Sequence, residues 1–224
     1  MNPLSRITFI DLSHRIDEAT APFPGDPPVE VRVLSAASGP SSPGQPRVNL
    51  SFLGMSLHCG THADAPFHFF EDGLRIDQVP LEVFCGPAVL IRLRDMGLMT
   101  PIEVRHLSAF ESSLRGAHRV VLHTGWHHRW GEDGYFTGHP FLTPEAARYL
   151  VDQGSRLVGV DMPSVDHAPH DAHVVLLGSG VVIVENLTNL DAIRGDVFQL
   201  ACFPLKLGGR DGSPVRAVGW IEEG

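Results

Sequence analysis

The chain has 224 residues and a formal net charge of −9 at pH 7, from 17 Lys and Arg against 26 Asp and Glu. This length fits one or at most two domains, and 43% hydrophobic with 19% charged residues excludes a disordered protein. The acidic balance argues against a nucleic-acid or anionic-membrane partner, since phosphate groups bind to basic surfaces. The 13 histidines stand out, because histidine is the commonest metal ligand and the usual acid–base residue near neutral pH.

Cysteines and apolar runs bear on the compartment. The 3 cysteines form no CxxC pair, which fits a reducing compartment better than a disulfide framework. Charges interrupt the first residues, so they lack the apolar stretch of a signal peptide, and no apolar run approaches the ~18 residues of a membrane span. We therefore expect a cytoplasmic protein.

The first quarter of the chain contains a low-complexity segment. Residues 35–46 are rich in Ser, Pro and Gly, which predicts a surface loop. Val48, Leu50 and Phe52 then alternate with polar residues, which predicts a strand that enters the histidine-rich segment that follows.

The rest of the chain alternates short β-type runs with turns. We expect strands over 87–93, 119–123, 157–161, 181–185, 200–207 and 215–221, and a turn at 208–212 that joins the last two as a hairpin. Helices are expected over 100–116 and 143–154, each introduced by a Thr-Pro pair, and the first also carries the residues of a capping box. This order predicts a single α/β domain with a β-rich mixed sheet and about two main helices.

Residues 57–68 hold the densest group of possible metal ligands. His58, His62, Asp64 and His68 all occupy even positions, and side chains alternate faces in an extended chain, so the four would share one face. Two imidazoles and a carboxylate from His58, His62 and Asp64 suit zinc, manganese or iron(II). No Lys or Arg lies among them, so a metal or a proton must compensate the carboxylate.

A second pair of candidate ligands lies further along the chain. His173 and Glu185 bracket an almost wholly apolar stretch, and Glu185 ends a predicted strand, where an unpaired buried carboxylate would be costly. From this segment alone two interpretations stay open: a metal ligand, or a carboxylate that leaves the core for solvent.

The string HCGTHADAPFH at 58–68 resembles the HxGTHxDxPxH signature of the cyclase family of metal-dependent hydrolases, which includes kynurenine formamidase and isatin hydrolase, at every fixed position. The similarity spans nearly the whole chain. It includes the segments 11–13, 23–26, 124–126 and 161–166, and the pair His173 and Glu185.

The resemblance implies a single domain over residues 1–224 with a swivelling β/β/α fold, and a homodimer or higher homo-oligomer. It also implies one or two zinc or manganese ions per chain. His58, His62 and Asp64 would hold one ion, and Asp64 would bridge to a second held by His173 and Glu185. His68 matches the catalytic histidine of the family.

The implied activity is hydrolysis of a carbon–nitrogen bond other than a peptide bond in a small molecule. A metal-activated water would attack an amide carbonyl while His68 moves a proton to the leaving nitrogen. We expect an arylformamidase of tryptophan catabolism that converts N-formylkynurenine to kynurenine and formate. A cyclic amide hydrolase of the isatin hydrolase type is the alternative, because the signature encodes the metal and the proton shuttle but not the pocket.

Residue types and spacing bear on two other functional classes. A cupin-type dioxygenase also uses His and carboxylate ligands, but its motif starts with His-x-His, whereas the spacing here is His-x3-His-x-Asp. A non-catalytic metal-binding or ligand-sensing protein would have no need of a proton shuttle such as His68.

Aromatic residues and further histidines complete the candidates. Phe23, Phe67 and Trp126 could form an aromatic wall that stacks on an aryl amide, with core packing as the competing interpretation. His127 and His128 are expected on a loop surface. His167 and His170 are expected in solvent, although one of them could orient a metal ligand.

Overall fold

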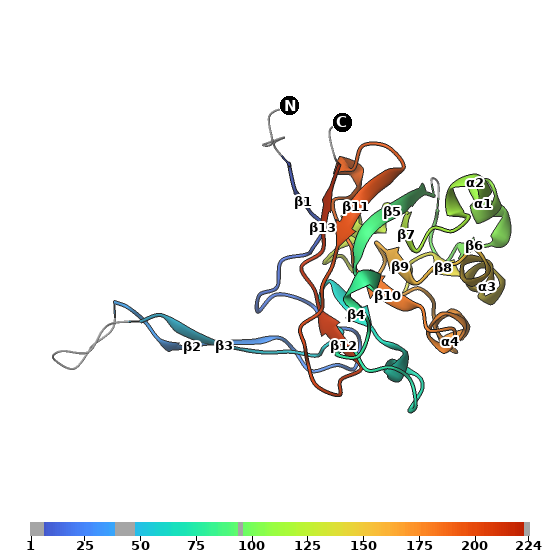
Figure 1. The fold of residues 1–224 in the computed structure, drawn as a ribbon. Coiled ribbons are helices and arrows are strands. Elements are labelled where there is room, and N and C mark those ends of the chain that lie inside the picture. Colours follow the sequence, from blue (N-terminus) through green and yellow to red (C-terminus); the bar gives the residue numbers. More distant parts are fainter. Residues whose placement is uncertain (1–6, 39–47, 94–95, 222–224) are drawn as a thin grey trace.

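A sheet of nine strands organises the chain in this computed structural model, which describes residues 7–38, 48–93 and 96–221. The strands lie in the order β1-β13-β11-β5-β7-β9-β10-β4-β12 (Figure 1). In chain order they are β1 (Ile10–Asp11), β4 (His62–Asp64), β5 (Cys85–Arg92), β7 (Arg119–His123), β9 (Leu157–Val160), β10 (Val182–Glu185), β11 (Val197–Ala201), β12 (Gly212–Pro214) and β13 (Val218–Trp220).

The middle of this sheet is parallel and its sides are antiparallel. Strands β5, β7, β9 and β10 run parallel to one another, whereas β11 and β13 on one side and β4 and β12 on the other pair antiparallel. The strands β7, β9 and β10 are rich in Val and Leu and almost wholly buried, as expected where both faces of a sheet are covered. The mixed sheet confirms the predicted α/β class.

In the described ranges, four helices cover one side of the sheet (Figure 1): α1 (Val104–Ser108), α2 (Glu111–Leu114), α3 (Pro144–Asp152) and α4 (Asp171–Gly178). Successive strand residues alternate between two apolar cores. Val120 and Leu122 pack in the core that contains the helices, whereas Val121 packs in the second core. The sheet therefore separates the two cores, and α4 lies in the first.

Two smaller sheets and four 3-10 helices complete the described chain. Strands β2 (Glu30–Ser35) and β3 (Leu50–Gly54) pair antiparallel into an arm that projects from the body (Figure 1). Strands β6 (Pro101–Ile102) and β8 (Phe141–Leu142) pair in parallel. The 3-10 helices are η1 (Pro66–His68), η2 (Leu81–Val83), η3 (Trp126–Arg129) and η4 (Leu190–Ala192).

All six strands predicted after residue 85 are present, as β5, β7, β9, β10, β11 and β13. The strand predicted over 200–207 ends at Ala201, because Pro204 cannot donate a backbone hydrogen bond to a ladder. The arm was not predicted. The strand predicted to enter the histidine-rich segment is present as β3, and only its pairing with β2 was unforeseen; residues 39–46 of the predicted loop lie outside the described residues.

Of the two predicted helices, one is confirmed and one is shorter than predicted and divided, and a further helix was missed. Helix α3 begins as predicted, since the Thr143 hydroxyl accepts a hydrogen bond from the backbone N–H of Ala146. The helix predicted over 100–116 begins only at Val104, because β6 takes up Pro101 and Ile102, and it divides into α1 and α2. Helix α4 was missed because its sequence, DAHVVLLG, is apolar in most positions and shows no helical period. None of the described helices is long and apolar enough to cross a membrane.

Candidate functional site

Strand β4 carries two of the predicted ligands on one face. His62 and Asp64 are two positions apart, so their side chains point to the same side of the sheet. On the neighbouring β10, Glu185 lies opposite His62, and Ile183 lies opposite Asp64. Residues directly opposite each other share a face, so the register of β4 and β10 brings the carboxylate of Glu185 to the histidine.

His58 and His68 reach the site by a turn and a 3-10 helix, not along one extended strand as the even spacing suggested. His58 precedes Gly60, whose φ of 68° lies in the left-handed region that glycine tolerates, so the chain turns before β4. His68 is the last residue of η1, which begins at Pro66 shortly after β4 has ended. Gly212 on β12 leaves room for His58, because a Cβ there would lie 2.8 Å from its ring.

Helix α4 brings in His173 from the other side. Its first turn is held by Asp166, whose Oδ2 accepts hydrogen bonds from the backbone N–H groups of Ala172 and His173. The Oδ1 of Asp166 lies 2.7 Å from Nδ1 of His173. This contact directs Nε2 of His173 toward Asp64 and Glu185, and a carboxylate that orients a histidine in this way is common behind metal ligands.

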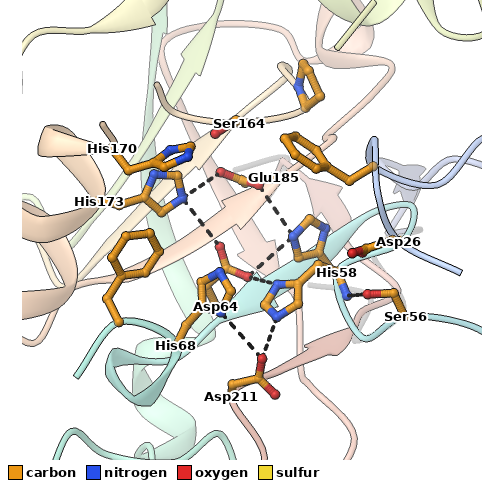
Figure 2. A pocket seen from close by; sticks show the side chains of 14 residues that line it. Asp26, Ser56, His58, Asp64, His68, Ser164, His170, His173, Glu185 and Asp211 are labelled. Atoms are coloured by element: carbon orange, nitrogen blue, oxygen red, sulfur yellow. Dashed lines mark hydrogen bonds and ion pairs between the residues drawn. The ribbon is translucent and has the colours of Figure 1, made fainter. Parts of the chain in front are cut away.

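Figure 2 shows two carboxylates surrounded by imidazoles. The Nε2 of His62 lies 3.3 Å from Asp64 Oδ1 and 3.4 Å from Glu185 Oε2. The Nε2 of His173 lies 3.4 Å from Glu185 Oε1 and 4.0 Å from Asp64 Oδ2. His58 Nδ1 is closer, 2.7 Å from Asp64 Oδ1. We call these five residues the inner cluster: His58, His62, Asp64, His173 and Glu185.

The donor set of the inner cluster fits a metal. Ligand atoms about 2.0–2.1 Å from a tetrahedral ion lie about 3.3 Å from each other, which is close to the spacing around His62 and His173. Two sets of three ligand atoms each lie within 4.8 Å of one another, and Asp64 belongs to both. They are His58, His62 and Asp64, and Asp64, His173 and Glu185. In the described chain no lysine or arginine lines this cavity to neutralise the carboxylates.

Electrostatics of the inner cluster point to the same need for positive charge. Burial alone would lower the pKa of His58, but the carboxylates of Asp64 and Asp211 outweigh it and raise that pKa to about 9. Against the same effect of burial, Asp166 and Glu185 raise the pKa of His173 to about 10. Burial would raise the pKa of Asp64, but His62 and His58 hold it well below its usual range. Protons or divalent cations can supply the positive charge that these carboxylates require.

His68 lies at the edge of the inner cluster with a different environment. Its ring stacks on His58 with 4.1 Å between centroids, and its Nδ1 is 3.4 Å from Oδ2 of Asp211. The same Asp211 oxygen lies 2.8 Å from Nε2 of His58. Burial lowers the pKa of His68, in contrast to the histidines of the inner cluster. A neutral imidazole beside the two ligand sets can accept a proton.

The inner cluster and His68 open into a cavity of about 440 Å³. Its apolar wall includes Phe23 and Phe69, and Phe69 stacks on His173 with 5.0 Å between ring centroids. Two of the three predicted wall residues do not line this cavity. Phe67 packs against the guanidinium of Arg75, and Trp126 is buried in the helix-side core.

The remaining histidines divide differently from the sequence prediction. His127 was expected on a loop surface but is buried, because its ring nitrogens face the carboxylates of Asp161 and Asp191. His128 is exposed, as expected. His170 lines the cavity with Nδ1 3.0 Å from Asp166, whereas His167 lies against the carbonyl of His139.

Two carboxylates near the ligands were not found by sequence reasoning. Asp166 lies seven positions before His173 and acts as a turn-capping residue, a role that only the conformation of residues 166–173 shows. Asp211 lies in the predicted turn at 208–212, directly before β12, and the pairing of β12 with β4 places it near the ligands. An acidic residue in a glycine-rich turn was the only available signal, and it is weak.

Comparison with solved structures supports this architecture. Isatin hydrolase A from Labrenzia aggregata bound to benzyl benzoate is similar with a TM-score of 0.84 and 26% identity, over 97% of this chain and 94% of that one. A structure described as a predicted metal-dependent hydrolase from Bacillus stearothermophilus has a TM-score of 0.78 and 26% identity, over 97% and 100% of the two chains. The fold expected from the family resemblance is thereby confirmed.

Sequence comparison identifies the family. A kynurenine formamidase of Bacillus cytotoxicus is 38% identical over 216 residues, which are 94% of this chain and 96% of the relative. A kynurenine formamidase of Geobacillus thermodenitrificans is 37% identical over 97% of both chains. The family model Cyclase, described as "Putative cyclase", matches residues 10–167. These matches show that the chain belongs to the Cyclase family.

Proposed function

We propose that this protein is a metal-dependent arylformamidase, which hydrolyses N-formylkynurenine to kynurenine and formate. The observation that carries the proposal is the pair of buried carboxylates, Asp64 and Glu185, each facing imidazoles in a cavity that His68 borders. The names of the curated relatives agree with a hydrolase of carbon–nitrogen bonds other than peptide bonds.

The inner cluster is the proposed metal centre, with one or two ions per chain. His58, His62 and Asp64 would hold one ion, and Asp64, His173 and Glu185 would hold the second. A bound divalent metal supplies Lewis acidity, which lowers the pKa of water and polarises a carbonyl group. Zinc and manganese both accept imidazole and carboxylate ligands.

His68 is the proposed proton carrier. Its Nδ1 faces Asp211, so its Nε2 is the atom that takes the proton of the attacking water. The oxygen of this water bonds to the formyl carbon, and the bond between that carbon and the aryl nitrogen breaks. His68 then gives its proton to the leaving nitrogen, so formate and the free amine are released. The lowered pKa of His68 keeps it neutral and able to begin this cycle near pH 7.

The cavity wall bears on the choice of substrate. Phe23 and Phe69 present rings to the cavity and would contact the aryl group of an arylformamide. A cyclic amide, as in the isatin hydrolase to which this chain is similar over 97% of its length, would use the same metal ligands and the same His68. This hydrolysis of a cyclic amide is the second candidate function.

Turnover of a small substrate panel tests the proposal. N-formylkynurenine, isatin and simple lactones and amides would be supplied with zinc or manganese, using the Asp64→Asn variant as the negative control. We expect the highest kcat/KM for N-formylkynurenine. Isatin as the best substrate would favour the second candidate, and a loaded metal centre without turnover of any substrate would instead indicate a ligand-binding protein. Full activity in metal-free protein would refute the metal mechanism.

A homodimer or higher homo-oligomer is part of the proposal. The arm exposes apolar side chains on both strands, with 72% of Val33 and 54% of Leu53 accessible. Exposed apolar surface of this extent is typical of an interaction site, and a second copy is the proposed partner. Light scattering on a Val33→Glu, Leu53→Glu double variant should show a smaller particle than the unchanged protein.

Domain extent and location stay predictions. We propose one domain over residues 1–224, since the nine-stranded sheet includes β1 near the beginning and β13 near the end of the described chain. We propose a cytoplasmic location, which the free thiols of Cys59, Cys85 and Cys202 support.

A further inference from the structure

A second group of histidines lies outside the catalytic cavity. His123 ends β7, His127 and His128 belong to η3, and Asp191 belongs to η4. We call these four residues the outer cluster. None of them lines the cavity of the inner cluster, and three of them border a separate open cavity of about 470 Å³.

The donor atoms of the outer cluster are spaced like metal ligands. Nε2 of His123 lies 3.4 Å from Asp191 Oδ1, and Nε2 of His127 lies 3.1 Å from Asp191 Oδ2. Ligand atoms of these three residues all lie within 4.8 Å of one another. Nε2 of His128 is a further donor, 2.9 Å from Asp191 Oδ2. His123, His127 and Asp191 supply three of the four donors of a tetrahedral zinc site, whose donors lie about 3.3 Å apart, and His128, which approaches Asp191 alone, would supply the fourth.

Asp161 prepares His127 for this role. The carboxylate of Asp161 is fully buried and accepts hydrogen bonds from the backbone N–H groups of Thr124 and Gly125 and from the Thr124 hydroxyl. With these donors around it, it also faces Nδ1 of His127 at 3.0 Å. With a proton on Nδ1 held by Asp161, Nε2 of His127, which faces Asp191, would be the nitrogen that binds an ion. A carboxylate behind the distal nitrogen is the usual support of a metal-bound histidine.

No nearby lysine or arginine of the described chain pairs with Asp191 in place of the imidazoles. His123 has only 10% of its side chain exposed, and its Nδ1 has no hydrogen-bond partner in the described chain, so Nε2 provides its polar contact with Asp191. The neighbouring guanidinium of Arg92 is bound by Asp196 and by the carbonyls of Ile193 and Gly195. Asp191 therefore has imidazoles as its partners, and the open cavity gives an ion access to it.

We propose that the outer cluster is a second metal centre, separate from the catalytic one, which takes a divalent transition-metal ion such as zinc. His123, His127 and Asp191 are its ligands, and the exposed His128 completes the set. The ion would join η4 to the segment between β7 and η3, so its role is structural. The competing arrangement is a protonated His127 that donates one hydrogen bond to Asp161 and one to Asp191, without an ion. The experiment must distinguish this arrangement from the metal centre.

Metal counting on the whole chain tests the proposal. The unchanged protein, Asp191→Asn and a matched control, Asp196→Asn, would be dialysed against zinc, and bound zinc would be counted by mass spectrometry. Both replaced carboxylates are more than half exposed, so the fold should tolerate the changes. We expect about one ion fewer per chain in Asp191→Asn alone, with unchanged amide hydrolysis. An equal zinc count in all three proteins would overturn the proposal.

Chemical modification of His128 gives a local readout. Its side chain is 65% exposed, so diethyl pyrocarbonate should modify it readily in the absence of metal. Zinc should slow this modification severalfold in the unchanged protein and in Asp196→Asn, but not in Asp191→Asn. If zinc does not slow the modification in the unchanged protein, His128 is not a ligand of the ion. If, in addition, Asp191→Asn binds as much zinc as the unchanged protein, the whole site is refuted.

Discussion

The inner and outer clusters share their residue types and even their spacing, since His58 and His62, like His123 and His127, are separated by three residues. They differ in the carboxylates that the histidines face. The side chains of Asp64 and Glu185 are 1% and 6% exposed, whereas that of Asp191 is 56% exposed. Water can stabilise Asp191 in part, but it has much less access to the inner pair. Burial of the carboxylate, and not the histidine spacing, therefore decides how strongly a cluster requires a cation.

The largest effect should come from Asp64→Asn. Asp64 belongs to both inner ligand sets, so its loss should remove bound metal and reduce turnover by far more than the ~100-fold typical for an outer-shell partner. Metal content and kcat/KM would be measured together. Asp191→Asn is the matched control in the outer cluster and should retain activity. If both variants kept full activity, the proposed difference between the clusters would be wrong.

His68→Ala separates proton transfer from metal binding. We expect full metal content with kcat reduced by ~10²–10⁴, because an imidazole that carries a proton in the transition state contributes about this much. His128→Ala, an exposed histidine of the outer cluster, serves as the control for activity. Loss of metal from His68→Ala would make His68 a ligand and would remove it from its proposed role.

Asp166→Asn should weaken the inner cluster without dismantling it. The amide cannot accept the Nδ1–H of His173 as strongly as the carboxylate does, so we expect metal affinity to fall by ~10–100-fold. Competition with a chromogenic chelator measures this change. High metal concentration should restore most of the activity, and an unchanged affinity would show that the orientation of His173 does not depend on Asp166.

The smallest predicted effect concerns His139, whose Nδ1 contacts a backbone carbonyl and not a carboxylate. His139 is buried beside His167, and burial lowers its pKa from 6.5 to about 4. Between these two values the unfolded chain binds more protons than the folded chain, so this group makes the protein less stable as the pH falls. From pH 7 to pH 5 it should remove about 2 kcal/mol from the free energy of unfolding.

Urea unfolding at the two pH values checks this contribution. His139→Gln cannot titrate, so its stability should fall less between pH 7 and pH 5 than that of the unchanged protein. The matched control is His118→Gln at an exposed site, which should keep the full pH dependence. An equal loss of stability in His139→Gln and the unchanged protein would contradict the lowered pKa.

Local patterns predicted what depends on local sequence. The strand β7 has the predicted bounds, and the signature segment placed His62 and Asp64 on one face of β4. The arm was missed, although Val31 and Val33 alternate with polar residues, because β2 pairs with β3 across the low-complexity segment at 35–46. Helix α4 was missed because burial on several sides removes the amphipathic period.

Long-range packing accounts for the errors at the site. Asp211 meets His58 across 153 positions of chain, which no local pattern reveals. Trp126 could be an aromatic wall or a core residue on sequence grounds, and its position in the helix-side core removes it from the cavity. The burial of His127 follows from Asp161, 34 positions away.

The connection that follows β9 supplies one carboxylate to each cluster. Asp161 at its beginning holds His127, and Asp166 at its end holds His173. A displacement of this six-residue connection would shift both imidazoles at once, so the two clusters share a mechanical support although they share no ligand. A single substitution between Asp161 and Asp166 should therefore reduce both catalysis and metal binding by the outer cluster.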